Sequence, residues 1–129
     1  MRRSSRTLPI VWLAASVGAA GAAAAFAHAY SAPSATTLRY DEDDGRFRGR
    51  VDSPRRSCEE QRKVKLVKHT SSGNEVVGRT RSNAKGRWSI EQGNANGAYH
   101  AVVVRRNHTP PGHIHQCQRG TSGTITVDP

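Results

Sequence analysis

Two cysteines, Cys58 and Cys117, are the only thiols of the chain. They do not form a C-x-x-C motif, which excludes a redox site of the thioredoxin kind. Two free thiols or two metal ligands are the alternatives to a disulfide. A disulfide would close a loop of 59 residues, for which the chain-entropy model gives roughly 4 kcal/mol of stabilisation. Because the chain begins with an export signal, described below, and exported thiols tend to pair, we predict one intramolecular disulfide.

Three histidines lie close to Cys117 in the sequence: His108, His113 and His115. In a strand, positions 113, 115 and 117 would face the same side. Imidazole and thiolate are ligands of zinc and copper, and two histidines two positions apart on a strand can reach one ion. A cysteine in a disulfide cannot bind a metal, so we interpret these histidines as structural or loop residues and expect no cofactor. A weak metal site at His113 and His115 is the alternative.

Arginines occupy alternate positions in the segment 46–51, where Arg46, Arg48 and Arg50 are separated by apolar or small residues. This period of two is typical of a strand with one face in a core and the other in water. The arginines would then form a stripe with a spacing of about 6.6 Å along the strand. Guanidinium groups bind phosphate and carboxylate through two parallel hydrogen bonds, so such a stripe can hold an anionic polymer. The alternative is a solvated outer face whose charges prevent edge-to-edge aggregation.

The sequence contains no motif that is typical of an enzyme active site. Serines and histidines are present, but no G-x-S-x-G elbow places a nucleophile in a known context. Glu59 and Glu60 are adjacent and would point apart, which does not suit a pair of glycosidase carboxylates. The acidic run at 41–44 lacks the ligand spacing of an EF-hand. We therefore predict a non-catalytic protein.

Composition limits the size of the core and the kind of protein. The chain has 129 residues and a mass of 14.0 kDa, which allows one ordinary domain and excludes a multidomain enzyme. Hydrophobic residues make up 35% and aromatic residues 5%, so the core must be small. The formal net charge is +10, and because the predicted leader at 1–29 holds three arginines and no acidic residue, most of this basic character belongs to the rest of the chain.

The first 29 residues resemble a secretory signal peptide in three consecutive zones. A basic start is followed by an apolar stretch from about Leu8 to Phe26 and then by the small-residue end Ala27-His28-Ala29. This end predicts cleavage before Tyr30, and therefore a secreted protein with no membrane contact after cleavage. The alternative is a retained signal anchor, because about 19 apolar residues can just span a bilayer.

The rest of the chain divides into a predicted flexible acidic linker, 30–45, and a β domain, 46–129. Alternating segments predict about seven short strands, and segments rich in Gly, Asn and Pro predict the turns between them. The clearest strand patterns are at 46–51, 62–68, 88–90, 99–103 and 124–127. No stretch combines a helical period with helix caps. We predict an antiparallel β-sandwich, with a small barrel as the competing architecture.

Four short motifs in this β domain lie at predicted strand and turn positions. They are Gly49-x-Val51, Arg62-x-Val64-x-Leu66, Gly78-x-Thr80-x-Ser82-x-x-x-Gly86-x-Trp88-x-Ile90 and Gly97-x-Tyr99-x-Ala101-x-Val103. Together they resemble the carboxypeptidase regulatory-like, or transthyretin-like, domain over about residues 46–105. The resemblance implies an Ig-like, prealbumin-like sandwich that acts as a non-catalytic module with a structural or surface-binding role.

The partner expected from these features is an anionic polymer of the envelope or the extracellular space. Modules of the resembled family sometimes bind carbohydrate or surface polymers, and the arginine stripe supplies the matching charge. Nucleic acid is not expected as a specific partner of an exported protein, although charge alone attracts it. We expect a monomer.

Overall fold

The computed structural model describes residues 29–108 and 114–129. These residues form strands and turns, with a single 3-10 turn at Arg56–Cys58, so the all-β prediction is confirmed. The strands are β1 (Ala29–Ala32), β2 (Ala35–Thr36), β3 (Arg39–Asp41), β4 (Arg46–Asp52), β5 (Lys63–Thr70), β6 (Gly73–Arg81), β7 (Arg87–Glu91), β8 (Gly97–Val103), β9 (Arg106–His108), β10 (Ile114–Cys117), β11 (Gly120–Thr121) and β12 (Ile125–Val127). The described residues thus hold more strands than the seven expected, because several span only two to four residues. Within these residues no helix is both long and apolar enough to cross a membrane.

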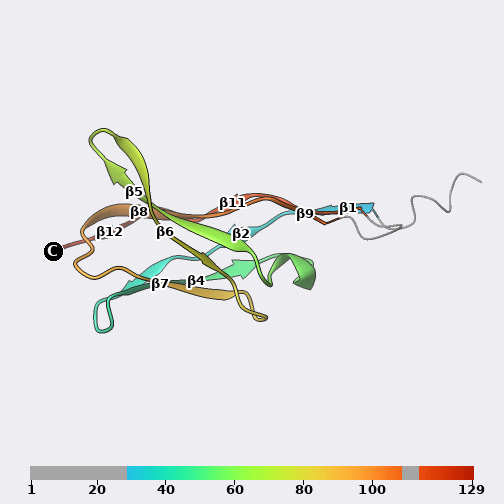
Figure 1. Cartoon of the computed structure of the whole chain (residues 1–129), viewed down its shortest axis with the longest axis horizontal. Helices are drawn as coiled ribbons and strands as arrows, with labels where there is room; N and C mark the ends of the chain where they lie inside the picture. Colours follow the sequence, from blue (N-terminus) through green and yellow to red (C-terminus); the bar gives the residue numbers. More distant parts are fainter. Residues whose placement is uncertain (1–28, 109–113) are drawn as a thin grey trace, which may run out of the picture.

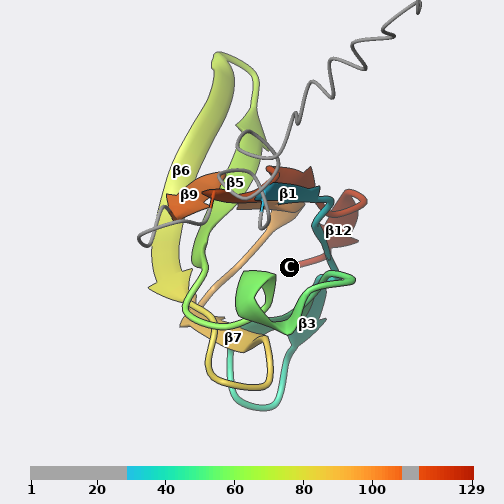
Figure 2. The ribbon, with the colours of Figure 1, turned by 90° about the vertical axis from the view of Figure 1, so that its right-hand side faces the viewer.

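The strands form three sheets. One has the order β11-β8-β5-β6 with β12 also on β8, a second has the order β2-β4-β3 with β7 also on β4, and a third has the order β1-β10-β9. All pairs are antiparallel except β1 with β10. In Figure 1 the first sheet lies above β4 and β7 of the second, and the third extends the upper layer to the right. The end view in Figure 2 shows β6 running down one side from the upper layer toward β7.

One apolar core fills the space between the two larger sheets. Phe47 and Val51 point into it from β4, Trp88 points in from β7, and Leu66 and Tyr99 point in from the facing sheet. The rings of Phe47 and Tyr99 have centroids 4.7 Å apart and so join the two layers directly. Each such side chain contributes about 1.5–3 kcal/mol by leaving water. The alternation seen in the sequence therefore fixes which face of each strand is buried.

Two glycines occupy positions that a side chain would spoil. Gly49 lies opposite Trp88 in the β4–β7 pair, and a Cβ atom there would overlap the indole ring and the carbonyl oxygen of Thr37. Gly86 closes the turn before β7 with a φ of +78°, which strains residues that carry a Cβ. The indole ring of Trp88 is held by a 2.9 Å hydrogen bond that its Nε1 donates to the Thr36 hydroxyl.

Residues 30–45, expected to be a flexible linker, instead lie in the folded domain. Strand β1 pairs with β10, whereas β2 and β3 pair with β4. Leu38 and Tyr40 pack against the core, and the acidic run becomes the turn between β3 and β4. The prediction was wrong because small Ser, Ala and Thr residues carry a weak hydrophobic signal, although their backbone groups complete the sheets.

The predicted disulfide is present. Cys58 and Cys117 are both buried, with their Cα atoms 5.4 Å apart. The bond ties the 3-10 turn to the end of β10, and Ala32 and Tyr30 pack around it as a small second cluster. It therefore anchors the third sheet, which contributes little to the main core.

Candidate functional site

The structure places the predicted arginine stripe on the outer face of β4. Phe47 and Val51 between the arginines are fully buried, whereas Arg46, Arg48 and Arg50 are partly or well exposed. The period-two pattern therefore gave the correct side of the strand for all three arginines.

Carboxylates meet two of these arginines at the ends of the stripe. Arg46 lies 3.5 Å from a Glu91 carboxylate oxygen across the β4–β7 pair, and Arg50 lies 3.5 Å from Asp52 on its own strand. Exposed pairs of this kind stabilise a protein by about 0–1 kcal/mol. These carboxylates lower the net positive charge at the two ends of the stripe, but the ion pairs are weak enough for Arg46 and Arg50 to exchange partners.

The middle arginine receives its partners from the acidic segment. Arg48 pairs with Asp44 and lies 3.9 Å from Asp41. The run that the sequence suggested was a solvated linker therefore neutralises part of the stripe. Sequence alone could not place it there, because the contact requires β3 to pair with β4.

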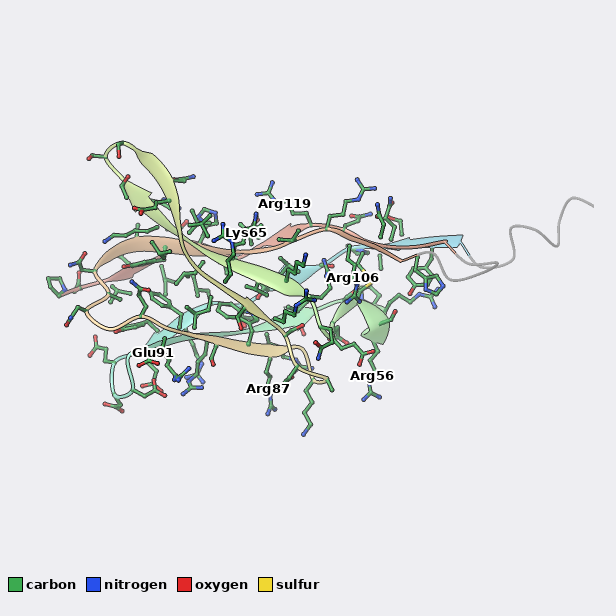
Figure 3. The ribbon with its side chains drawn as sticks, in the orientation of Figure 1. Arg56, Lys65, Arg87, Glu91, Arg106 and Arg119 are labelled. Atoms are coloured by element: carbon green, nitrogen blue, oxygen red, sulfur yellow. A yellow bond between two sulfur atoms is a disulfide. The ribbon has the colours of Figure 1, made fainter. Side chains whose placement is uncertain are left out.

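Strand register adds two further arginines beside the stripe. Arg39 on β3 lies opposite Arg48, and Arg87 on β7 lies opposite Arg50. Among the described residues, no carboxylate forms an ion pair with Arg39 or Arg87. These four arginines line a hollow of about 480 Å³, here called the arginine hollow, which is completed by Thr37, Gly49 and Trp88. In Figure 3 Arg87 projects downward from the lower layer into solvent.

A second cationic group lies on the other large sheet. Lys63 is opposite Arg81, and Lys65 is opposite Arg79, in the β5–β6 pair. The four side chains, here called the basic tetrad, line a hollow of about 500 Å³ together with Val104. None of the four forms an ion pair within the described part of the chain. Alternation in the sequence gave each strand's outward residues, but only the register brings them together.

The metal alternative at His113 and His115 stays a prediction, because it includes a residue that the structure does not describe. Cys117 is in the disulfide, His113 lies outside the described residues, and His115 stacks on Tyr30 with ring centroids 4.4 Å apart. Across residues 29–108 and 114–129, no group of three or more His, Cys, Asp or Glu residues is arranged to hold a metal ion.

A different histidine pair forms on the outer face of β5 and β8. His69 Nε2 lies 2.6 Å from His100 Nδ1, which makes a hydrogen bond between the two rings. Burial lowers the pKa of His100, and the nearby His69 and Arg119 lower it further. The two histidines are 31 residues apart in the sequence, which is why no local motif revealed them.

Arg62 is the largest fully buried side chain. Its guanidinium donates to the carbonyl oxygens of Cys58, Val104 and Gln118 at 2.7–2.9 Å, and to the Ser34 hydroxyl at 2.7 Å. No carboxylate accompanies it among the described ion pairs.

This environment disfavours the charge of Arg62. Burial, and then repulsion from Arg106, lower its pKa to about 10. The guanidinium nevertheless joins four chain segments near the disulfide, so its role is structural. A partial signal for this position exists in the sequence, because Arg62 directly precedes β5 and continues its alternation with the buried Val64 and Leu66.

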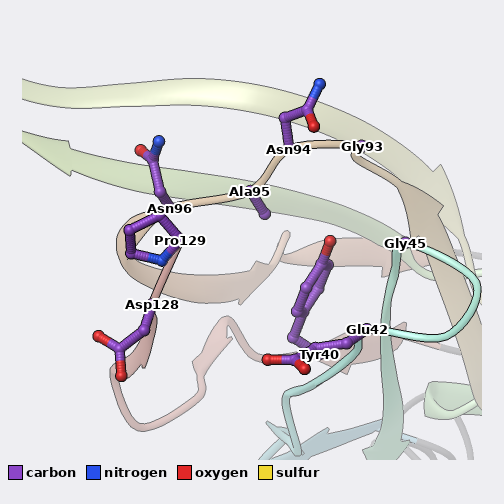
Figure 4. Close-up of a pocket in the computed structure, with 9 residues that line it drawn as sticks. All are labelled: Tyr40, Glu42, Gly45, Gly93, Asn94, Ala95, Asn96, Asp128 and Pro129. Carbon is purple, nitrogen blue, oxygen red and sulfur yellow. The ribbon is translucent and has the colours of Figure 1, made fainter.

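A further hollow of about 460 Å³ lies at the end of the sheets near the C-terminus (Figure 4). Tyr40 stands at its centre, and its hydroxyl donates to the Gln92 carbonyl at 3.3 Å. The side chains of Asn94, Asn96 and Asp128 point away from the Tyr40 ring (Figure 4). The polar groups do not converge, so this hollow offers a poor geometry for catalysis.

Comparison with protein-family models, curated proteins and solved structures finds no match to this chain. The function is therefore inferred from geometry alone. The arginine hollow and the basic tetrad each bring four cationic side chains together.

Proposed function

We propose that this protein is an exported, non-enzymatic β-sandwich module that binds a linear anionic polymer outside the cytoplasm. The observation that carries the proposal is the arginine hollow, in which four guanidinium groups from three strands surround one depression. Export is supported by the three-zone pattern of residues 1–29, which lie mostly outside the described part, and by the disulfide, which suits an oxidising compartment. The resemblance to carboxypeptidase regulatory-like domains supports a binding role.

The arginine hollow suits a repeated oxyanion. Arg39 and Arg87 have no carboxylate partner in the described chain and can each donate two parallel hydrogen bonds to a carboxylate, sulfate or phosphate. Arg48 and Arg50 are already held by aspartates. Because an exposed ion pair contributes only about 0–1 kcal/mol, exchanging these aspartates for polymer anions costs little.

An acidic polysaccharide fits the hollow better than a nucleic acid does. Proteins that bind single strands stack bases on exposed aromatic rings beside their cationic groove. Here Phe47, Trp88 and Tyr99 are buried in the core. Charge without stacking platforms favours a polymer that carries oxyanions but no bases.

Binding of the purified protein to immobilised polygalacturonate, measured across a salt series, tests the proposal. The double variant Arg39→Gln/Arg87→Gln removes two contacts and should lower the dependence of log K on log salt by about two, roughly one for each lost contact. The matched control Arg105→Gln/Arg119→Gln removes the same charge from exposed positions that line neither hollow. Equal losses in the two variants, with unchanged melting temperatures, would show that only net charge matters and would reject the site.

Export is tested separately by sequencing the N-terminus of the secreted protein, which should begin at Tyr30. Recovery of an intact N-terminus held in the membrane fraction would establish the anchor alternative.

A further inference from the structure

The arginine hollow and the basic tetrad lie on either side of the turn that connects β6 to β7. Strand β6 ends at Arg81, a member of the tetrad, and β7 begins at Arg87, a member of the hollow. The six residue steps between them limit the distance between the two Cα atoms to ~20 Å. The short turn therefore connects one member of each group, although the two groups belong to different sheets.

The space between the two groups is itself partly basic. A hollow of about 300 Å³ is lined by Arg50 and Arg87, shared with the arginine hollow, and by Arg56 and Lys85. Lys85 stands in the turn between β6 and β7. Glu59 is the acidic residue among those that line this intermediate hollow. Cationic side chains thus extend from the arginine hollow into the β6–β7 turn that leads to the tetrad.

The tetrad carries a cost that a ligand would relieve. Like charges directly opposite each other on paired strands destabilise a sheet, and the β5–β6 pair contains two such pairs in succession, Lys63 with Arg81 and Lys65 with Arg79. With no carboxylate paired to them in the described chain, these charges lack the internal compensation that aspartates give the β4 stripe. A polyanion bound across the tetrad would supply it.

From these observations we propose that a single polyanion chain occupies both groups, passing from the arginine hollow around the β6–β7 turn to the basic tetrad. The inference rests on the proposed function and adds the path and the length of the ligand. Figure 3 shows Arg87 projecting below the lower layer, whereas Lys65 lies at the level of the upper layer. A small anion or a short rigid oligomer touches one group at a time, and only a long flexible chain reaches both.

The path makes affinity depend on chain length. When one segment of a long chain is bound at the arginine hollow, the next segment meets the tetrad at a high effective concentration. We expect long polygalacturonate to bind at least ~10-fold more tightly than an oligomer of three or four sugars, with both affinities expressed per chain. Calorimetry at low salt should show that each protein binds two short oligomers. With a long chain, each protein should instead occupy a single stretch of that chain.

The variant Lys63→Gln/Lys65→Gln tests the tetrad. It should abolish the gain in affinity with length and reduce the number of bound short oligomers from two to one, whereas Arg105→Gln/Arg119→Gln should leave both measurements unchanged. Retention of the length gain by Lys63→Gln/Lys65→Gln, with normal melting, would overturn the shared path. Cross-linking of proteins by long chains without a gain in affinity would also overturn it, since the two groups would then act as independent sites.

The failure of this inference differs from failure of the proposed function. If Arg39→Gln/Arg87→Gln loses short-oligomer binding while the lysine variant behaves as the original protein, the arginine hollow stands and the path is rejected. If polygalacturonate fails to bind the original protein at low salt, the proposed function is rejected. Tighter binding of single-stranded DNA of equal length and charge would overturn the assignment to a polysaccharide.

Discussion

Replacing Arg62 by methionine tests whether a buried cation holds this end of the fold together. Methionine keeps most of the side-chain length but cannot donate hydrogen bonds. Three backbone carbonyl oxygens would lose their guanidinium partner, those of Cys58, Val104 and Gln118. A buried acceptor left unpaired costs about 1–3 kcal/mol, and a part-buried one costs less; since only the Cys58 bond is buried and the other two are part-buried, the gross loss is at most about 9 kcal/mol.

A second effect opposes this loss. The pKa of Arg62 falls to about 10 because the site penalises its charge, and a fall of that size corresponds to about 3 kcal/mol. Removal of the charge relieves this penalty, and apolar replacement of buried ions is neutral or stabilising in some proteins. Because several carbonyls converge on one guanidinium here, we expect the loss to be larger than the relief, with a net destabilisation of up to about 6 kcal/mol.

Urea unfolding with the disulfide intact measures this difference. Arg105→Met, at an exposed position, serves as the control and should change the free energy of unfolding by less than about 0.5 kcal/mol. A stability of Arg62→Met equal to or above that of the original protein would refute the reasoning, since it would show that the carbonyls do not depend on the guanidinium.

Three further predictions concern the disulfide, a core glycine and acid stability. Replacing Cys58 and Cys117 together by serine should lower the free energy of unfolding by roughly 4 kcal/mol, and a change below about 1 kcal/mol in urea titration would contradict a stabilising bond. Gly49→Ala should cost at least about 1–3 kcal/mol because its Cβ atom would overlap backbone and an indole ring, whereas Gly93→Ala, where an added Cβ meets nothing within 4 Å, should melt as the original protein does. Since the folded state lowers the pKa of His100, the unfolded chain binds more protons just below pH ~6.5. The free energy of unfolding should therefore decrease as the pH is lowered through that range, and His100→Gln should flatten this pH dependence.

The outward arginines of β4 were predictable because alternation is a local property of a strand. Arg46, Arg48 and Arg50 alternate with residues that the core accepts, so one segment decides which way each side chain points. The disulfide was equally accessible, because the chain has only two cysteines. In both cases no knowledge of distant pairing was needed.

The rest of the candidate site depends on register, which the sequence does not state. Arg87 joins the arginine hollow because β7 pairs with β4, and Arg39 joins it because a segment with few apolar residues still forms β3. The basic tetrad arises from the β5–β6 register in the same way. Arg62 shows a different limit: it continues the alternation of the buried Val64 and Leu66, but because burying a charge is costly, alternation alone does not predict that an arginine points inward.

NMR titration of the protein with a short oligogalacturonate at low salt shows directly whether the arginine hollow is the binding site. We expect amide shift changes concentrated on β3, β4 and β7 around Arg39, Arg48, Arg50 and Arg87, with a second set of changes at the tetrad. Changes confined to the third sheet around Tyr30 and Cys117, or spread evenly over all exposed basic residues, would contradict it.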